Sequence, residues 1–248
     1  MKTIKTAHLI FDGAIHLDEL RAFRSAINLV NEKKDVLLHH HLSDDKLLYR
    51  YPLVQFKQIG SKPAIFTLNE GTESLTQMIT AKEVTLNIKG KVFPLNVLKI
   101  HFEQVNLCFT EGLIPYKITH WIALNEKNYQ VYQKSQNLKQ QIELLERLLT
   151  AHIIAFAEGI SWSLEKRIEL NITKIQKQSW LTLKRTKLLA FDVHFLANLL
   201  LPNYVGLGKS CSVGFGMVEC LPKTQKSKKE NWNNFLKRRK RKLETYEQ

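Results

Sequence analysis

The sequence predicts an α+β protein of two similar halves, each with its strands and helices in the order β-α-β-β-α-β. Two observations favour this fold. The 248 residues suffice for two compact cores of ordinary size, and short apolar runs alternate with segments of helical periodicity in both halves. This order is typical of ferredoxin-like domains. We therefore expect two tandem ferredoxin-like (RRM-like) domains, which share the order of their elements without a residue-level repeat.

The first half is expected to begin with a strand over residues 3–11, because this apolar run ends at the turn-forming pair Asp12-Gly13. A helix is expected next, since apolar residues recur at helical spacing from Leu17 to Val30. The remaining elements predicted for this half are a hairpin of residues 49–57 and 62–68 about Gly60-Ser61, a short helix over 70–81, and strands over 83–90 and 97–109.

The second half is expected to begin after a polar stretch with glycine and proline at residues 110–115, where we predict the domain boundary. The elements predicted beyond it are a strand over 117–124, a long helix over 136–160, strands over 167–176 and 180–193, a short helix over 195–202 and a last strand over 213–221. The predicted units are therefore residues 1–112, residues 113–222 and a basic tail of residues 223–248.

The charge of the chain indicates a polyanionic partner. Its 37 Lys and Arg against 23 Asp and Glu give a net charge of +14, of which the tail contributes +7. Six consecutive basic residues at 237–242 favour contacts with phosphates. The three cysteines form no C-x-x-C pair and indicate reduced thiols, and the N-terminal segment has the pattern of neither a signal peptide nor a membrane span. We therefore expect a cytoplasmic protein without a membrane partner.

Four of the ten glycines fall within residues 206–216, in the segment GLGKSCSVGFG. Such a loop can turn sharply, and its backbone N–H groups can bind phosphate oxygens. The dinucleotide-binding pattern does not fit, because Cys211 stands where the third glycine is required. The phosphate loop of nucleotide hydrolases does not fit, because Asn203 replaces its first glycine and an extended segment follows. A structural turn that places Phe215 in the core is the alternative, and it is compatible with RNA binding.

The spacing G-x-G-x5-G-F-G resembles the glycine-rich loop of the RAMP superfamily of CRISPR-associated proteins. Over residues 1–222 the chain is similar to the CRISPR repeat endoribonucleases of that superfamily, the CRISPR-associated protein six family. The resemblance implies metal-independent cleavage of CRISPR precursor RNA within its repeats, without a cofactor, and a loop that holds RNA. Many loops of the superfamily carry several basic residues, whereas this one has only Lys209. The loop residues predicted to bind RNA are Gly206, Gly208, Lys209, Ser210, Gly214, Phe215 and Gly216.

Metal-independent RNA cleavage requires a general base for the 2′-hydroxyl and an acid for the leaving 5′-oxygen, and histidine suits both roles near neutral pH. The segment HHHLSDDKLLYRYP resembles a branch of the family that has an H-x-H pair before a Y-R-Y-P strand. The resemblance assigns catalysis to His39, His41 and Tyr49. In an extended chain the two histidines share one face. Arg50 and Lys57 are the candidates for stabilising charge on the phosphorane and binding RNA.

Two alternative functions remain open on the sequence: a non-catalytic RAMP subunit that holds guide RNA, and a nucleotide-hydrolysing enzyme. Asp44 and Asp45 make a metal site at the histidines a third alternative, but the chain lacks Cys or His pairs with the spacing of a structural zinc site. We therefore predict no metal. CRISPR repeat RNA is the expected partner, and other CRISPR-associated proteins and a second copy of the chain are further candidates. Trp162 and Trp180 are expected in the core, although an exposed aromatic residue on such a sheet can stack on bases.

Overall fold

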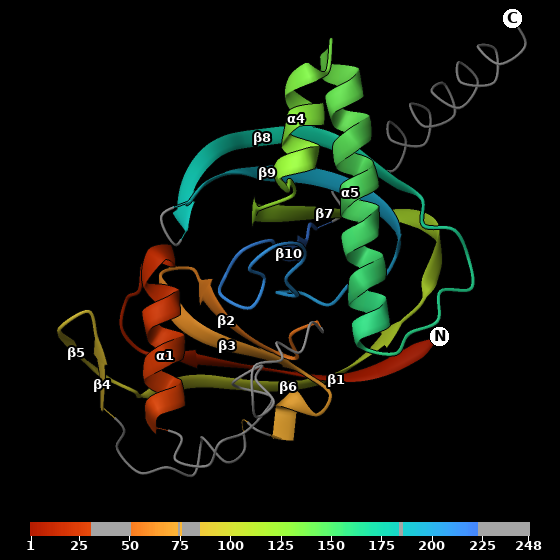
Figure 1. Ribbon diagram of the computed structural model, residues 1–248. Helices are drawn as coiled ribbons and strands as arrows, with labels where there is room; N and C mark the ends of the chain where they lie inside the picture. Colours follow the sequence, from red (N-terminus) through yellow and green to blue (C-terminus); the bar gives the residue numbers. More distant parts are fainter. Residues whose placement is uncertain (31–50, 74, 76–84, 184–185, 223–248) are drawn as a thin grey trace, which may run out of the picture.

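The computed structural model describes residues 1–30, 51–73, 75, 85–183 and 186–222. These residues form two four-stranded antiparallel sheets, a separate two-stranded hairpin and helices packed against the sheets (Figure 1). The predicted α+β class with two antiparallel-sheet domains is confirmed. Among the helices of the described ranges, none combines the length and the apolar character needed to span a bilayer.

The first sheet joins strands from both ends of the first half of the chain. In spatial order they are β2 (Val54–Ile59), β3 (Lys62–Leu68), β1 (Lys2–Phe11) and β6 (Val97–Leu107). The first strand lies between the third and the last, which is the split β-α-β arrangement of a ferredoxin-like domain. Of the helix predicted over 70–81, residues 71–73 and 75 are helical, and the others lie outside the described residues.

Helix α1 (Leu20–Val30), entered through the 3-10 turn η1 (Leu17–Glu19), packs against the first sheet (Figure 1). Its apolar residues recur at helical spacing as predicted, and Phe23 is fully buried. The ring of Phe23 meets those of Phe11 in β1 and Phe56 in β2 edge to face, with centroids 5.8 and 5.7 Å apart. These contacts fix α1 over the strand, β2, that matters most for the site described below.

The strand predicted over 83–90 does form, but it does not join the first sheet. It is β4 (Thr85–Ile88), which pairs with β5 (Lys91–Pro94), a strand that the sequence does not predict. Its inward residues Leu86 and Ile88 are buried in the apolar cluster under α1. Burial against the helix therefore takes the place of pairing with the sheet.

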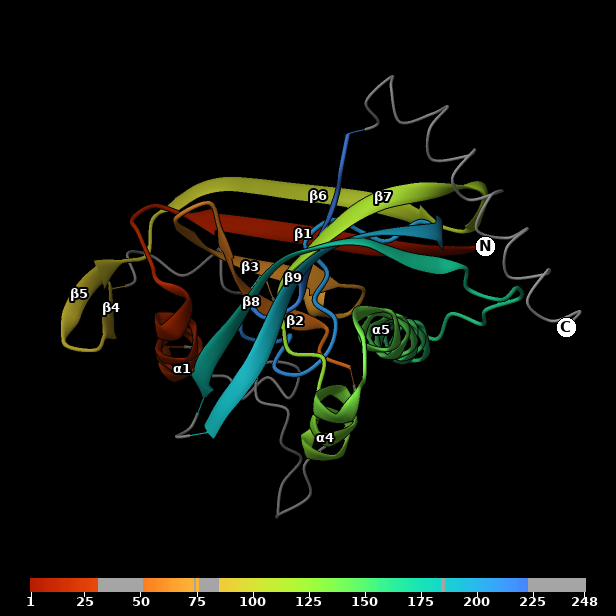
Figure 2. The same cartoon turned by 90° about the horizontal axis from the view of Figure 1, so that it is seen from above.

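The second sheet is built from the second half of the chain. In spatial order its strands are β10 (Met217–Cys220), β7 (Phe109–Trp121), β9 (Thr186–Leu199) and β8 (Leu170–Leu183). Two helices, α4 (Glu126–Lys134) and α5 (Leu138–Gly159), lie on one side of this sheet (Figure 2). The long helix predicted over 136–160 is confirmed, and its apolar stripe is buried at Leu145, Leu149, Ile153, Phe156 and Ile160, whereas Leu138 at its start is exposed.

Three element predictions for this half are wrong. The break expected between the strands 167–176 and 180–193 lies inside β8, which continues to Leu183. The segment 195–202, predicted as a helix, is the end of β9 as far as Leu199. Burial alternates along it, with Phe195, Ala197 and Leu199 inside, which is the period of a strand. Helix α4 is missing from the prediction, because Tyr132 is its one buried residue and its apolar pattern is weak.

The polar stretch 110–115, expected as a linker, belongs to β7. The pairing of β7 with β9 shifts register between Phe109 and Ile114, and such an irregularity accommodates Gly112 within a strand. Strand β6 ends at Leu107, so the two sheets follow each other almost directly along the chain. The division into residues 1–112 and 113–222 stays a prediction.

The two halves do not repeat the same order of elements, contrary to the expectation. Residues 200–216, all of which are described, contain no helix. The glycine-rich loop stands there, between β9 and β10, where a second helix is expected in a ferredoxin-like unit. The loop therefore replaces a helix of the second domain.

One cluster of buried apolar residues joins the two sheets. Ile4 and Phe66 of the first sheet belong to the same cluster as Tyr116 and Phe195 of the second. All four side chains are at most 1% exposed. The two halves therefore share buried apolar surface, which stabilises one arrangement of the sheets.

We expect the substitution Phe191→Ala to test the packing of the second half. Phe191 is fully buried, and its ring centroid lies 5.5 Å from that of Tyr132 and 6.2 Å from that of Trp121. The cavity left by alanine should lower the free energy of unfolding by about 3–5 kcal/mol in urea titrations. Val131→Ala on the exposed side of α4 is the control and should cost less than about 1 kcal/mol. Equal small losses for both variants would contradict the packing.

Candidate nucleic-acid interface

The glycine-rich loop, residues 206–216, lies between the two sheets (Figure 1). On one side the N–H of Phe56 in β2 donates to the carbonyl of Ser212, with a nitrogen-to-oxygen distance of 2.8 Å. On the other side the N–H of Gly216 donates to the carbonyl of His120 in β7, at 3.2 Å. The backbone of the loop is thus bonded to strands from both halves of the chain.

A polar cluster closes the contact between β2 and the loop. The hydroxyl of Tyr51 donates to the carbonyl of Gly206 at 2.6 Å, and the N–H of Gly206 donates to Oε1 of Gln55 at 2.9 Å. The amide nitrogen of Gln55 in turn donates to the hydroxyl of Tyr51 at 2.9 Å and to the carbonyl of Pro52 at 3.0 Å. Burial raises the pKa of Tyr51 well above its usual value, so this hydroxyl stays protonated and remains a donor.

Lys57 lies fully buried beneath the loop. Its Nζ donates to the carbonyl of Cys211 at 3.1 Å, and burial lowers the pKa of Lys57 to about 8. The sequence places this residue among those that stabilise charge on RNA, and its position corrects that expectation. The ammonium group is enclosed under the loop and supports it through the carbonyl of Cys211.

Three glycines of the loop have the left-handed backbone conformation, with φ of +84° at Gly208, +93° at Gly214 and +63° at Gly216. A Cβ atom at Gly216 would overlap the backbone carbonyl of Leu207. At Gly214 it would overlap the side chain of Leu20 in α1. The glycine pattern therefore meets a packing requirement within the loop and between the loop and α1.

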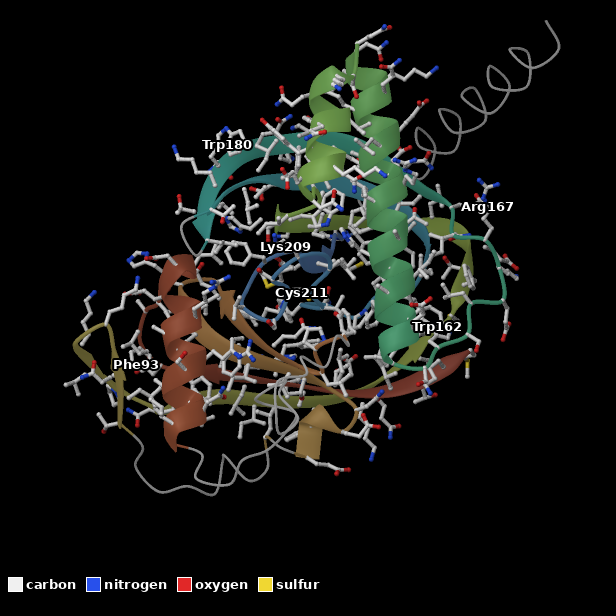
Figure 3. The ribbon with its side chains drawn as sticks, in the orientation of Figure 1. Phe93, Trp162, Arg167, Trp180, Lys209 and Cys211 are labelled. Carbon is white, nitrogen blue, oxygen red and sulfur yellow. The ribbon has the colours of Figure 1, made fainter. Side chains whose placement is uncertain are left out.

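Part of the loop faces solvent near Lys209, whereas Cys211 two residues further on is buried; Figure 3 labels both residues. Lys209 is exposed, and Gly208 and Ser210 are partly exposed. The other loop residues predicted to bind RNA are buried, namely Gly206, Gly214, Phe215 and Gly216. Contacts with a polyanion can therefore come from the tip around Lys209.

The predicted catalytic residues His39, His41 and Tyr49, together with Arg50, lie outside the described residues. The chain is described again from Tyr51, whose hydroxyl is bonded to the loop. The segment that carries the histidines therefore leads directly into the residue that anchors the loop. Within the described ranges, no group of His, Cys, Asp and Glu side chains is arranged to hold a metal ion.

Trp121 and His152 support the loop from the second sheet, a role that the sequence does not reveal. The Nε1–H of Trp121 donates to Nδ1 of His152 in α5 at 3.1 Å. Burial lowers the pKa of His152 to about 4, so the ring stays neutral and keeps its acceptor. The backbone of Gly208 packs against the Trp121 indole. The one available signal is a histidine within the apolar stripe of α5.

Gly216→Ala should destabilise the protein more than Gly60→Ala, because the two sites share a backbone conformation and differ in their surroundings. Both have φ of +63°, so alanine suffers the same strain of about 1–2 kcal/mol. Gly60 has open space around it, whereas Gly216 abuts a backbone carbonyl. Urea titrations should give a loss of at least about 3 kcal/mol for Gly216→Ala. Equal losses would show that the loop tolerates a side chain here.

Lys57→Met should stabilise the protein in a pH-dependent way. Below about pH 8 the wild-type protein encloses a charged ammonium, whose desolvation lowers the free energy of unfolding. As the pH rises from about 8 toward the ordinary lysine pKa of 10.5, Lys57 loses its proton in the folded state and the wild type becomes more stable. The free energy of unfolding of Lys57→Met minus that of the wild type should therefore fall by about 2 kcal/mol from pH 7 to pH 10.

Urea titrations at the two pH values measure this difference. Burial raises the pKa of Tyr51 in both proteins, so this contribution cancels to first order. Burial also raises the pKa of Cys211 and Lys57 lowers it, so both proteins carry Cys211→Ala to remove this coupling. A difference that does not change with pH would contradict a charged lysine under the loop.

Comparison with known proteins agrees with this architecture. Residues 2–106 match the family model of the Cas6b N-terminal domain, and residues 108–221 match that of the Cas6b C-terminal domain. An uncharacterised protein of Methanocaldococcus jannaschii is 34% identical over 136 residues, which are 54% of this chain and 90% of that protein.

Two crystal structures share the fold. A Cas6b structure superimposes with a TM-score of 0.81 at 23% identity, and a CRISPR RNA processing endoribonuclease Cas6b superimposes with a TM-score of 0.67 at 22% identity. Each likeness covers 89% of this chain and 100% of the other. The tandem ferredoxin-like arrangement is therefore common to all three. Since both family domains match and together span nearly all of residues 2–221, this chain belongs to the Cas6b family.

Proposed function

We propose that this chain is a metal-independent endoribonuclease that cleaves CRISPR precursor RNA within its repeats. The observation that carries the proposal is membership of the Cas6b family over both domains. A protein of the same fold is a CRISPR RNA processing endoribonuclease. The net charge of +14 supports an RNA substrate, because cationic side chains displace the counterions of a phosphate backbone.

In the proposed reaction one histidine of the pair His39 and His41 takes the proton of a 2′-hydroxyl, whose oxygen attacks the adjacent phosphorus in line. The bond from phosphorus to the 5′-oxygen breaks, and the other histidine gives that oxygen a proton. The products are a 2′,3′-cyclic phosphate and a 5′-hydroxyl, and no water is consumed. Tyr49 orients a reacting group or donates a hydrogen bond to the phosphate, and Arg50 stabilises the phosphorane.

The glycine-rich loop would position the RNA, with Lys209, Gly208 and Ser210 at its solvent-facing tip. The N-terminal domain, residues 1–112, would supply the histidines, and the C-terminal domain, residues 113–222, would supply the loop. The basic tail from residue 223 would add phosphate contacts. The bond from Tyr51 to Gly206 supports this division of labour, because it ties the chain next to the histidine segment to the loop.

His39→Ala and His41→Ala should each lower the single-turnover rate of repeat cleavage by about 10²- to 10⁴-fold, because each removes an acid or a base. The affinity for the RNA should change little. The assay uses repeat RNA from the CRISPR array of the same genome, in the presence of a chelator. His40→Ala removes a neighbouring imidazole and should cleave at the wild-type rate.

A repeat RNA with a 2′-deoxyribose at the cleaved nucleotide should bind and stay intact, because the attacking oxygen is missing. Cleavage of this RNA, or wild-type rates in both histidine variants, would place the chemistry elsewhere. A wild-type protein that binds repeat RNA and never cleaves it would favour a guide-RNA-binding subunit instead.

A further inference from the structure

A groove separate from the glycine-rich loop runs between helix α5 and strand β8. Two hollows of about 820 and 450 Å³ form it, lined by successive stretches of α5 and β8, and we call it the α5–β8 groove. None of its lining residues belongs to the loop. β8 is the edge strand of the second sheet, so no strand of the described chain covers the groove side. The two hollows therefore lie along an unpaired strand edge, where an elongated ligand can contact both.

The rim of the α5–β8 groove is cationic. Five exposed cations line its two hollows, namely Arg147, Lys166, Arg167, Lys174 and Lys177. They face two carboxylates, those of Glu143 and Glu146, and the second accepts the N–H of Ile172 at 2.9 Å. No ion pair joins the five cations to a carboxylate of the described residues. The groove therefore favours an anionic ligand.

Apolar side chains lie between these cations. Leu138 and Ile154 of α5 are 60% and 39% exposed, and Leu164, Ile168 and Leu170 line the first hollow. An unpaired RNA strand fits this combination, because its phosphates can meet the rim while its bases turn toward apolar surface. A duplex fits it less well, because its bases are stacked inside the helix.

Trp180 adds an aromatic surface toward the other end of β8. The residue is 57% exposed, which corrects the expectation that it belongs to the core. Its ring meets that of Tyr129 in α4 edge to face, with centroids 5.9 Å apart, so its orientation is supported while its surface stays accessible. Figure 3 shows Arg167 and Trp180 toward opposite ends of β8. Exposed aromatic rings beside cations are typical of single-stranded RNA binding.

We propose that the α5–β8 groove binds an unpaired stretch of RNA that extends from the repeat, with its phosphates on the cationic rim and its bases toward the apolar floor and Trp180. This inference rests on the proposed function, since it assumes that RNA is the substrate. The groove contributes to affinity and leaves the chemical step unchanged. RNA with an unpaired extension should accordingly bind more tightly than the repeat alone.

The double variant Arg147→Gln/Arg167→Gln tests the proposal. The probe is fluorescein-labelled repeat RNA, protected from cleavage by a 2′-deoxyribose, with and without an unpaired extension at each end. Fluorescence anisotropy across a salt series should show binding of the extended RNA weakened by about tenfold, with a salt slope reduced by about 1.4, because two phosphate contacts are lost. Binding of the unextended repeat should not change.

Lys5→Gln/Lys99→Gln is the matched control, because it removes the same charge from exposed positions of β1 and β6. It should bind both RNAs like the wild type. Trp180→Ala should weaken binding of the extended RNA without changing the salt slope, because stacking releases no counterions.

Groove variants that bind both RNAs like the wild type would overturn the proposal, as would equal losses in the groove and control variants. A polyglutamate peptide that binds the wild type and not the groove variants, with RNA affinity unaltered, would identify a protein-binding surface instead and also overturn it. A wild-type protein that binds neither RNA would refute the proposed function itself. That result differs from a protein that binds RNA with an affinity that the groove variants do not change.

Discussion

The docking of the glycine-rich loop on β2 is the contact on which the relative position of the two sheets depends. The N–H of Phe56 donates to the carbonyl of Ser212. Tyr51 and Gln55 form hydrogen bonds of 2.6 and 2.9 Å with the carbonyl and the N–H of Gly206. Withdrawal of the loop would remove the partners of the Phe56 N–H and of Gln55 Oε1, and each buried polar group left unsatisfied costs about 1–3 kcal/mol. Apolar burial brings the sheets together, and this polar contact selects one alignment.

The same contact connects the two regions of the chain that the proposed reaction needs. The loop holds Lys209 in solvent because its glycines let the flanking backbone pack tightly against Leu207 and Leu20. Tyr51, which follows the histidine segment directly, is held by the other side of the loop. The glycine pattern, which on the sequence indicates phosphate binding, thus first meets a demand of packing, and an RNA contact at the tip is added to it. The chain matches the family models of both Cas6b domains, which agrees with a loop of the second domain that is held by residues of the first.

Helices and strands that depend on residues close together in the chain can be predicted from the sequence. Contacts between residues far apart in the chain cannot. Strand β1, helix α1 and the hairpin about Gly60-Ser61 are confirmed because apolar period and turn residues are local signals. The helix predicted over 195–202 is wrong because the sheet, rather than local preference, decides that apolar segment. RNA binding by the loop stays a prediction, and of the loop residues named for it Lys209 is exposed and Gly208 and Ser210 are partly exposed. The sequence alone does not indicate that Lys57 is buried, because its partner, Cys211, lies 154 residues away along the chain.

Native-state hydrogen exchange at the backbone amides of Phe56 and Gly206 tests most directly whether the loop fixes the two sheets as one unit. Both amides donate across the contact, Phe56 to Ser212 and Gly206 to Gln55. If the docking is a structural constraint, both should exchange only through global unfolding, with the same free energy of opening as the central amides of β1. If these two amides exchange with a free energy of opening several kcal/mol lower than that of β1, the loop detaches without unfolding of the sheet, which would contradict the account.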